Sequence, residues 1–449
     1  MIKRASLSAG VLIAALLSIR AQDIKLSISG GSIPVLAVPE LRASGDAQRY
    51  MTTLNQTLWE DLAGSGMFKM AAKTMYPTAI PQQPQDFRQN QIAAGTAQGS
   101  RMADWSGPPV SADYVAFGYS AVQNGVFVLY GWMFDLRRDT PSAQVIGNRY
   151  PATLDEAGAT KAAHEFAADI ISQFGGHPLF GTHIYFTSDR TGHKEIWVMD
   201  ADGQNQRQIT KFNFLAQYPA VSPDGSKIAF TAWPGPGETP RIYVYSTDPV
   251  RDRRFYNQKS SVNGTPSFTP DGRQIVYVSA VGAAHRVFFA DLDGSNFREI
   301  TVSEFDDFEP KVNPRTGSEI VFSSGRSGRE QIYRTNMDGA DLERITDGTG
   351  EASNPCWHPD GRTIAFAWTQ GYDPGHFNVF TMDVASRTYV QLTHGEGKNE
   401  NPSWSPGGTH IVFGSNRSGS YQIWAMLADG TQVRQLTTIG NNMNPVWGR

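Results

Sequence analysis

The sequence predicts an N-terminal α/β domain followed by an all-β six-bladed β-propeller. Two helical periodicities lie before residue 177, whereas short strand patterns separated by turns fill the remainder. In that remainder, proline-led segments begin 47, 44, 45, 47 and 43 residues apart, at Pro219, Pro266, Pro310, Pro355, Pro402 and Pro445. A period near 45 residues with all-β content is typical of propeller blades, each of which is a four-stranded sheet.

The composition indicates a folded, turn-rich protein. Of the 449 residues, 40% are hydrophobic, 11% are aromatic and 44 are glycine, which argues against a disordered chain. This length allows about three average domains, although one propeller can occupy roughly 270 residues. The formal net charge is -4, and basic residues form no run longer than pairs such as Arg253 and Arg254. A nucleic-acid partner is therefore not expected.

Residues 1–21 are predicted to be an export signal peptide. Lys3 and Arg4 form its charged start, residues 11–17 form a short apolar stretch, and Ala21 offers a cleavage site. A buried N-terminal helix or a membrane anchor is the alternative interpretation.

The cysteine content also bears on the location of the protein. Cys356 is the single cysteine, so no intramolecular disulfide is possible and no cysteine follows the signal to carry a lipid. No later segment approaches 18 consecutive apolar residues. We expect a mature chain that is soluble in the periplasm.

Residues 22–176 are predicted to form the α/β domain. Tyr50, Leu54, Leu58 and Leu62 recur every four residues, as in an amphipathic helix, and the helix should end at residues 64–66. A second helix is predicted from the apolar face formed by Ala159, Ala162, Ala163, Phe166, Ile170 and Phe174. Strands are expected at residues 24–28, 33–38, 114–119 and 126–134, and a hinge at residues 175–178.

Residues 177–449 are predicted to form the propeller. In each repeat the proline-led strand precedes a short apolar strand, an outer strand, an Asp-Gly turn and a closing strand that ends at a dipeptide such as Ile345-Thr346. The first repeat, from Thr182, has no proline-led strand, and the last proline-led strand, residues 444–447, has no sheet after it. Pairing these two ends would complete a shared blade and close the ring.

The sequence contains no recognisable catalytic motif. The G-x-S-x-G, H-E-x-x-H, P-loop and G-x-G-x-x-G patterns are not found in a fitting context. Residues 200–203 (DADG) resemble part of a calcium loop but lack its downstream glutamate, so a hairpin turn is the preferred interpretation. His358 and His410 are expected to pack within blades, and Cys356 to be a buried, inert thiol. No cofactor, no metal and no enzymatic activity are expected.

The residues just before the leading prolines form the candidate binding site. We expect them in loops that precede the innermost strands, where they would crowd one mouth of the central channel. Asparagine before proline also favours a turn, and both explanations hold for the same residues. The candidates are Gln217, Tyr218, Gly264, Thr265, Phe308, Glu309, Ser353, Asn354, Glu400, Asn401, Met443 and Asn444.

With these features the chain resembles the TolB family of the Tol-Pal system. Its repeats follow the pattern P-x-[WF]-S-P-D-G…IAF…IY…D-G…LT, after an export signal and a short α/β domain. In that domain, residues 58–62 (LWEDL) and 65–68 (SGMF) are similar to a family helix and its following turn, and residues 132–135 (WMFD) to a family strand. The resemblance covers the whole mature chain.

The resemblance implies a non-enzymatic, monomeric periplasmic scaffold that supports outer-membrane constriction in cell division and envelope integrity. Its implied partners are Pal, the peptidoglycan-associated lipoprotein, at the propeller mouth, and TolA at an extended N-terminal segment, residues 22–32. Through them it would act indirectly on the outer membrane and peptidoglycan. The implied Pal-facing residues include Val262, Asn263, Gly264, Thr265, Phe308 and Glu309. The implied TolA-facing residues are Gln22, Asp23, Ile24, Lys25, Leu26, Ser27 and Ile28.

Two other functional classes stay open. A TolB-like paralogue that binds a polysaccharide or a different lipoprotein would have the same repeats. An exported propeller hydrolase or peptidase accessory would be indicated by channel residues with strongly shifted pKa values.

Overall fold

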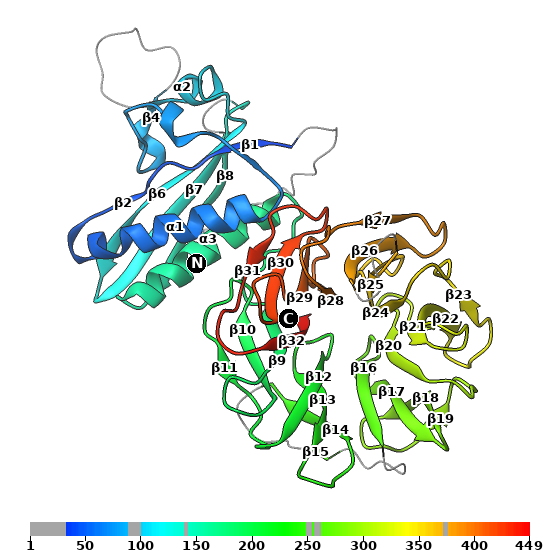
Figure 1. Cartoon of the computed structure of the whole chain (residues 1–449). Helices are drawn as coiled ribbons and strands as arrows, with labels where there is room; N and C mark the ends of the chain where they lie inside the picture. Colours follow the sequence, from blue (N-terminus) through cyan, green and yellow to red (C-terminus); the bar gives the residue numbers. More distant parts are fainter. Residues whose placement is uncertain (1–32, 89–99, 139–141, 248–253, 256–261, 371–375) are drawn as a thin grey trace, which may run out of the picture.

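The computed structural model describes residues 33–88, 100–138, 142–247, 254–255, 262–370 and 376–449. Figure 1 shows a domain of helices and strands beside a ring of small sheets. The predicted signal peptide, residues 1–21, and the predicted TolA-facing segment, residues 22–32, lie outside the described residues.

A mixed sheet forms the centre of the N-terminal domain, in the strand order β3-β1-β6-β7-β8 with β2 paired to β6. The antiparallel hairpin of β6 (Tyr114–Gln123) and β7 (Val126–Asp135) turns at Asn124 and Gly125, whose φ angles are 51° and 78°. Positive φ at both positions is the reason that an Asn-Gly pair suits this turn. The remaining strands are β1 (Val35–Ala37), β2 (Arg42–Ala43), β3 (Lys69–Met70) and β8 (Gln144–Ala152).

Two helices cover one face of this sheet and confirm the two helical periodicities. They are α1 (Met51–Gly64) and α3 (Glu156–Gln173), and the carboxylate of Asp155 caps α3 by accepting a hydrogen bond from Gly158 N at 2.7 Å. Their apolar stripes, with Leu54, Leu58, Leu62, Phe166 and Ile170, pack on alternate residues of β6 and β7.

Short elements cover the opposite face of the sheet. There Phe87 and Trp105 share a core with Phe117 and Phe134 of the central hairpin. These elements are η2 (Lys73–Met75), η3 (Pro84–Asp86), β4 (Phe87–Arg88), β5 (Ser100–Arg101) and α2 (Met102–Ser106), while η1 (Gly45–Tyr50) leads into α1. Neither β8 nor this layer was predicted from the sequence.

The propeller consists of six four-stranded sheets, which confirms the predicted blade number. Blades 1 to 3 are formed by β11-β10-β9-β32, β12–β15 and β16–β19. Their strands are β9 (His183–Ser188), β10 (Glu195–Asp200), β11 (Arg207–Gln208), β12 (Leu215–Val221), β13 (Lys227–Trp233), β14 (Arg241–Ser246), β15 (Arg254–Phe255), β16 (Asn263–Phe268), β17 (Gln274–Val281), β18 (Ala284–Asp291) and β19 (Arg298–Glu299).

Blades 4 to 6 are formed by β20–β23, β24–β27 and β28–β31. Their strands are β20 (Asp307–Val312), β21 (Glu319–Ser324), β22 (Gln331–Asn336), β23 (Glu343–Arg344), β24 (Ala352–Trp357), β25 (Thr363–Trp368), β26 (Asn378–Asp383), β27 (Tyr389–Gln391), β28 (Asn399–Trp404), β29 (His410–Ser415), β30 (Gln422–Leu427) and β31 (Arg434–Gln435). The predicted apolar strands are the second strands of these blades, and their phenylalanines, such as Phe322 and Phe413, are fully buried between neighbouring sheets.

The C-terminal strand closes the ring as predicted. Strand β32 (Asn442–Gly448) pairs antiparallel with β9, so that Trp447 lies opposite Ile184. The indole of Trp447 also donates a hydrogen bond to Thr182 Oγ1 at 2.9 Å, and its backbone nitrogen donates to Ser403 Oγ at 3.1 Å. Blade 1 therefore contains both ends of the propeller sequence, and its innermost strand is protected by pairing.

The closing strands are shorter than predicted. They end before the Ile-Thr or Leu-Thr dipeptides, as β23 does at Arg344, one residue before Ile345. The threonine instead accepts a hydrogen bond from the third strand: Thr346 Oγ1 binds the backbone nitrogen of Ile332 at 3.1 Å, and Thr437 Oγ1 that of Ile423 at 2.9 Å. The repeated threonine thus replaces a backbone acceptor where the strand has ended.

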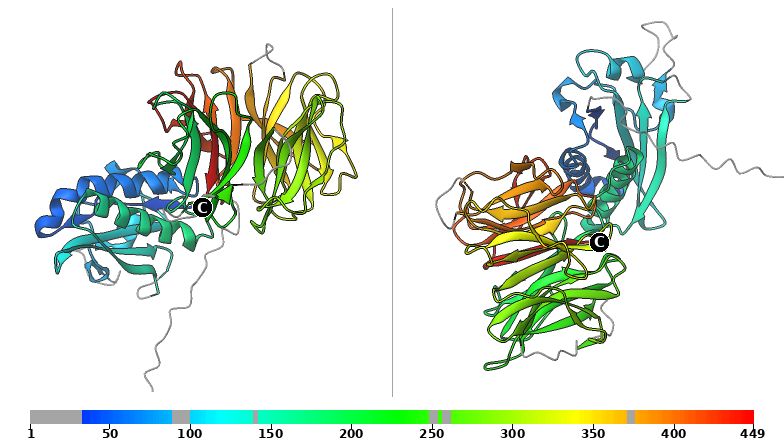
Figure 2. Two further views of the ribbon diagram at one scale, coloured as in Figure 1. Left: turned by 90° about the horizontal axis from the view of Figure 1, so that it is seen from below. Right: turned by 90° about the vertical axis from the view of Figure 1, so that its right-hand side faces the viewer.

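The N-terminal domain packs against one side of the propeller, over blades 1 and 6 (Figure 2). The ring nitrogen Nε2 of His410 lies 2.8 Å from the carbonyl oxygen of Gly64, at the end of α1. Burial lowers the pKa of His410 to about 4, so the histidine is neutral at pH 7.

Candidate functional site

Each innermost strand of the propeller contains a β-bulge at the residue that precedes its leading proline. The pairing register shifts between Gln217 and Ala220, Gly264 and Ser267, Phe308 and Lys311, Ser353 and Cys356, Glu400 and Ser403, and Met443 and Val446. The candidate residues that directly precede the leading prolines therefore lie inside the strands, and the expectation that they occupy preceding loops was wrong; Val262 alone among the propeller candidates lies outside a strand, one residue before β16. An extra residue in a strand re-aims its side chain without ending the strand, which the sequence pattern alone did not reveal.

The residue directly before each leading proline has a left-handed backbone. Their φ angles are 57° at Tyr218, 46° at Thr265, 54° at Glu309, 54° at Asn354, 53° at Asn401 and 50° at Asn444. We call these six residues the bulge ring. Asparagine tolerates this conformation, whereas Tyr, Thr and Glu adopt it at a cost of order 1–3 kcal/mol. The strain is repeated around one ring, which is a feature typical of ligand-binding surfaces.

Hydrogen bonds join four neighbouring members of the bulge ring. Asn354 donates to Glu309, through its backbone nitrogen at 2.8 Å and its side-chain Nδ2 at 2.5 Å. The backbone nitrogen of Asn401 donates to Asn354 Oδ1 at 3.2 Å, and Asn444 Nδ2 donates to Asn401 Oδ1 at 3.3 Å. Blades 4, 5, 6 and 1 are thus connected around the channel by side chains rather than by strand pairing.

Carboxylates near this ring have raised pKa values. Burial raises the pKa of Glu309 and outweighs its hydrogen bonds from Asn354 and Ser323 and the charge of Lys311. Burial, together with the negative charges of Glu309 and Glu351, also raises the pKa of Glu330 to about 7. At neutral pH Glu330 is therefore partly protonated, whereas an exposed glutamate would be fully ionised.

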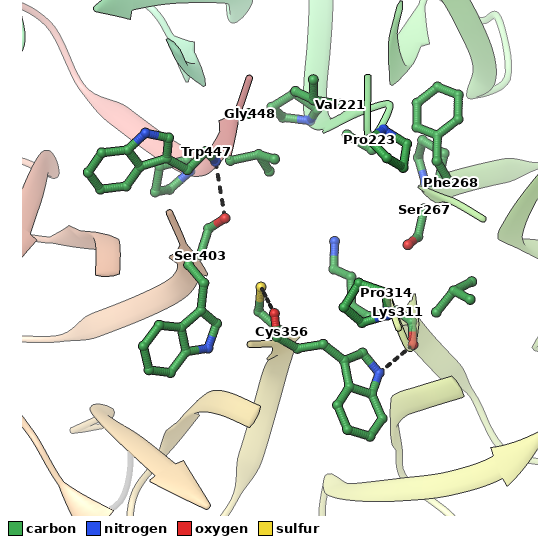
Figure 3. Close-up of a pocket in the computed structure, with 18 of the residues that line it drawn as sticks. Val221, Pro223, Ser267, Phe268, Lys311, Pro314, Cys356, Ser403, Trp447 and Gly448 are labelled. Atoms are coloured by element: carbon green, nitrogen blue, oxygen red, sulfur yellow. Dashed lines mark hydrogen bonds between the residues drawn. The ribbon is translucent and has the colours of Figure 1, made fainter. Parts of the chain in front are cut away.

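A cavity of about 470 Å³ occupies the centre of the ring, bounded by the innermost strands (Figure 3). The bulge ring lines one part of it. The residue directly after each leading proline also lines the cavity. We call these six residues the mid-channel belt: Ala220, Ser267, Lys311, Cys356, Ser403 and Val446. Cys356 is only partly buried and faces this cavity, which corrects the expectation of a buried thiol. Burial raises the pKa of its thiol, so the unreactive protonated form is favoured.

The other candidate residues differ in their access to solvent. Asn263 and Ser353 are buried, so their side chains support the mouth from within. Glu400 accepts a hydrogen bond from the hydroxyl of Tyr421, and the ring of Phe308 lies 5.5 Å from that of His285. Partial exposure is shared by the remaining candidates in the propeller, Gln217, Val262, Gly264 and Met443.

Three arginines that the sequence analysis missed support the mouth. Arg326 binds both carboxylate oxygens of buried Asp307, at 2.7 and 2.9 Å, and lies over the rings of Phe322 and Tyr333. Arg190 and Arg417 make the corresponding contacts to Asn442 and Asn399, at the starts of β32 and β28. The signal was present as Arg-Thr-Gly or Arg-Ser-Gly after the second strand of three blades.

Exposed apolar side chains also lie beside the mouth. Val302 is 80% and Phe305 53% exposed, in the segment that leads from blade 3 into the innermost strand of blade 4. Exposed apolar groups next to a polar, strained ring fit a surface that contacts another protein.

The mouth and the N-terminal domain lie on opposite faces of the propeller. The bulges are near the starts of the innermost strands, whereas the domain contacts turns at their other ends, near Gly407 and His410. A second cavity, of about 1100 Å³, lies between the two domains and is lined by α1, α3 and turns of blades 1 and 6. A partner at the mouth would therefore leave this domain interface uncovered.

Neither a metal centre nor a membrane-spanning helix is found in the described ranges. No three His, Cys, Asp or Glu residues there converge as metal ligands. The Asp200–Gly203 segment forms a turn, with Gly203 N donating to Asp200 O at 2.9 Å. None of the helices described combines the length and the apolar character that crossing a membrane requires.

Fold and site together define a six-bladed β-propeller protein whose channel mouth is a polar, strained ring. The chain belongs to the TolB β-propeller family: it matches the family described as "TolB beta propeller domain" over residues 170–371 and 345–449. It is 28% identical over 429 residues to the protein TolB homolog of Chlorobium luteolum, which covers 93% of this chain and 90% of that protein. It is also 29% identical over 255 residues to the Tol-Pal system protein TolB of Bordetella pertussis, which covers 56% of each chain.

The fold is shared with a solved structure of the same family. TolB from Acinetobacter baumannii superimposes with a TM-score of 0.75 over 93% of this chain and 97% of that chain, at 21% sequence identity. The match includes the N-terminal domain as well as the propeller, because the propeller, from residue 177 onward, is too short to account for that coverage.

Proposed function

We propose that this protein is a non-enzymatic, periplasmic scaffold of a Tol-Pal system. In this role the propeller mouth binds a Pal-like lipoprotein, and residues 22–32 bind a TolA-like protein. Docking of both partners would support outer-membrane constriction at cell division and envelope integrity, and the scaffold would be a monomer. The observation that supports the proposal most is the similarity to TolB proteins along nearly the whole chain, N-terminal domain included.

The geometry of the mouth supports a protein partner. The bulge ring presents Asn401, Asn444 and Thr265 around the channel, while Val302 and Phe305 add exposed apolar area beside it. Interfaces of this type combine an apolar centre with polar groups that fix orientation. The Oγ1 atom of Thr265 is buried and has no hydrogen-bond partner among the described residues, an unsatisfied polar group that is uncommon in a folded protein.

The direct test is isothermal titration of residues 22–449 with the soluble domain of the Pal-like lipoprotein from the same organism. We expect micromolar or tighter binding that Thr265→Arg weakens by about tenfold or more, because a long cation would obstruct the mouth. Thr316→Arg is the matched control, since Thr316 is exposed in the turn at the opposite end of the blade 4 strands. Equal affinities for both folded variants would place the interface elsewhere.

Charge reversal at Glu309 is not a clean test of this interface. Its carboxylate accepts three hydrogen bonds inside the ring, so the change would disturb the fold together with the mouth.

The proposed TolA contact requires its own experiment. A chain that begins at residue 33 should lose binding to the TolA-like domain and retain the affinity for the lipoprotein, because the mouth is formed by the propeller. Retained TolA binding would remove residues 22–32 from this role.

One observation favours the enzymatic alternative. The raised pKa of Glu330, about 7, is suitable for proton transfer near neutral pH. If the protein hydrolyses peptide or glycan substrates, Glu330→Gln should abolish the activity, whereas a scaffold should show no turnover that exceeds a buffer control.

A further inference from the structure

Lys311 is the single charged residue of the mid-channel belt. The other five blades place Ala220, Ser267, Cys356, Ser403 and Val446 at this position, so five of six belt side chains are neutral. The side chain of Lys311 points into the cavity, together with those of Ser267 and Cys356 from the two neighbouring blades (Figure 3). Blade 4 thus adds a cation to a channel wall that is otherwise uncharged at this level.

The ammonium of Lys311 has no ion-pair partner within 4.0 Å among the residues that the structure describes. Glu309 is the acidic residue of the same strand that lines the cavity, but its carboxylate is bound by Asn354 and Ser323. Burial raises the pKa of Glu309 in spite of the nearby charge of Lys311, so this carboxylate compensates the ammonium incompletely. A partly buried ammonium whose charge is incompletely compensated is unfavourable unless water or an anion solvates it.

Two hydroxyl groups of the mid-channel belt, one from the blade beside Lys311 and one from two blades away, are suited to hold such an anion. Ser267 lines the cavity from blade 3, and no hydrogen bond of its hydroxyl is found in the described part of the chain. Ser403 Oγ accepts a hydrogen bond from Trp447 N, and its own proton can be donated either to the neighbouring Cys356 thiol or to a bound anion. Three groups from three blades, an ammonium and two hydroxyls, therefore line the same level of the channel.

We infer that the mid-channel belt binds a carboxylate, with Lys311 as its counter-charge and Ser267 and Ser403 as hydrogen-bond donors. A monoanion matches the one cation of the belt. A phosphate, with a charge of about -1.5 to -2 at pH 7, would leave excess negative charge beside Glu309. The cavity of about 470 Å³ has room for an acetate-sized group and several waters.

The carboxylate has two possible sources. It is either a free small carboxylate or an acidic side chain that a docked protein extends through the bulge ring. The second source rests on the proposed function, because it requires a partner at the mouth. The chemistry at Lys311 is the same in both cases.

The first arm of the test uses sodium acetate as the probe. The parent chain, Lys311→Met and the control Lys227→Met are titrated with acetate against chloride at constant ionic strength. Acetate binding is followed by line broadening of ¹³C-acetate and by the fluorescence of Trp357, Trp404 and Trp447, which line the cavity. Lys227 is suitable as a control because its ammonium contacts only an exposed serine, Ser226, at 3.2 Å.

We expect saturable acetate binding by the parent and Lys227→Met, weakened about tenfold or more in Lys311→Met, since a hydrogen-bonded charge is removed. The variant Ser267→Ala/Ser403→Ala keeps the ammonium and should weaken binding severalfold. A thermal melt of each variant shows whether it folds. If Lys311→Met does not fold, the double serine variant still tests the site.

The second arm titrates the same variants with the soluble Pal-like domain. If acetate does not bind but Lys311→Met weakens the partner about tenfold and Lys227→Met does not, an acidic side chain of the partner is the ligand. If the partner does not bind the parent at all, the proposed function fails, and the acetate arm alone decides the inference. Acetate binding that Lys311→Met leaves unchanged, or no effect of Lys311→Met in either arm, would overturn it.

Discussion

Asn354 holds the carboxylate of Glu309 from the neighbouring blade through two hydrogen bonds, one from its backbone nitrogen and one from its side chain. Both residues precede a leading proline and have left-handed backbones. The bulge that exposes these residues to the channel also aligns the donor with the acceptor. The mouth is therefore an element of propeller stability as well as a candidate binding surface.

This relationship predicts the effect of Asn354→Ala. The change removes a donor from a buried carboxylate and places alanine at a φ of 54°, so the free energy of unfolding should fall by about 1–3 kcal/mol in urea denaturation. Asn354→Gly keeps the backbone conformation and should recover part of the loss. Asn296→Ala, at a left-handed but exposed turn, is the control, with an expected loss below about 1 kcal/mol. Equal losses at both positions would show that the ring has no special role.

The ion pair between Arg326 and Asp307 in blade 4 leads to a second prediction. Arg326→Met leaves the fully buried Asp307 without its cation, so the free energy of unfolding should fall by about 3–5 kcal/mol. Arg329→Met, three residues away at an exposed position, should change it by less than about 0.5 kcal/mol. The double variant Arg326→Met/Asp307→Asn should recover stability relative to Arg326→Met, because no unpaired buried charge remains. A double variant as unstable as the sum of the single changes would contradict this.

Glu330 predicts how stability depends on pH. Its pKa is about 7 in the folded protein and near 4.5 when unfolded, so the folded state binds more protons between these values. Stability should therefore decrease as pH rises from about 4.5 to 7, by up to about 3 kcal/mol from this group. Glu330→Gln should flatten the slope in urea melts at pH 5 and pH 8. A residual slope of the same sign is expected from Glu309, whose pKa is also raised.

The control for this experiment is Glu304→Gln, which changes an exposed glutamate in the same face of the propeller. It should preserve the slope of the parent chain. A slope that is insensitive to Glu330→Gln would place the titrating group elsewhere.

A histidine at the domain interface predicts a second pH effect. His164 of α3 lies 2.6 Å from Asp61 of α1 and 3.9 Å from Asp202 of blade 1. Burial by itself lowers the pKa of His164. The hydrogen bond to Asp61 and the charges of Asp61, Asp202 and Asp200 outweigh burial, so the pKa is raised overall. Because the pKa of His164 is raised in the folded protein, the contact stabilises the docked domains fully at pH values below the unfolded pKa, near 6.5. This stabilisation is lost as the pH rises through the folded pKa.

The measurement for His164 is small-angle scattering at pH 5.5 and 8.5, together with urea melts. The radius of gyration of the parent should increase at high pH, and His164→Gln should remove the dependence at a cost of about 0.5–1 kcal/mol at low pH. His183→Gln is the control, because His183 is more exposed and its distance to Asp200 is longer, 3.5 Å. Identical scattering of parent and His164→Gln at both pH values would exclude this role.

The propeller and its closure could be predicted from the amino-acid sequence. The regular interval between leading prolines gave the blade number, and the unmatched strands at Ile184 and Trp447 gave the shared blade. The helices α1 and α3 followed from apolar residues on one helical face. These features are local or periodic, so a pattern along the chain is sufficient to reveal them.

The chemistry of the mouth, in contrast, depends on tertiary contacts that the sequence does not reveal. Nothing in the sequence distinguishes a loop before Pro310 from a bulge within β20, because the difference lies in pairing with β21. The hydrogen bond between Glu309 and Asn354, 45 residues apart, and the orientation of Lys311 into the channel depend on how neighbouring blades meet. Periodicity fixes which strands form, but the burial and charge of a side chain depend on residues that only the closed ring brings into contact.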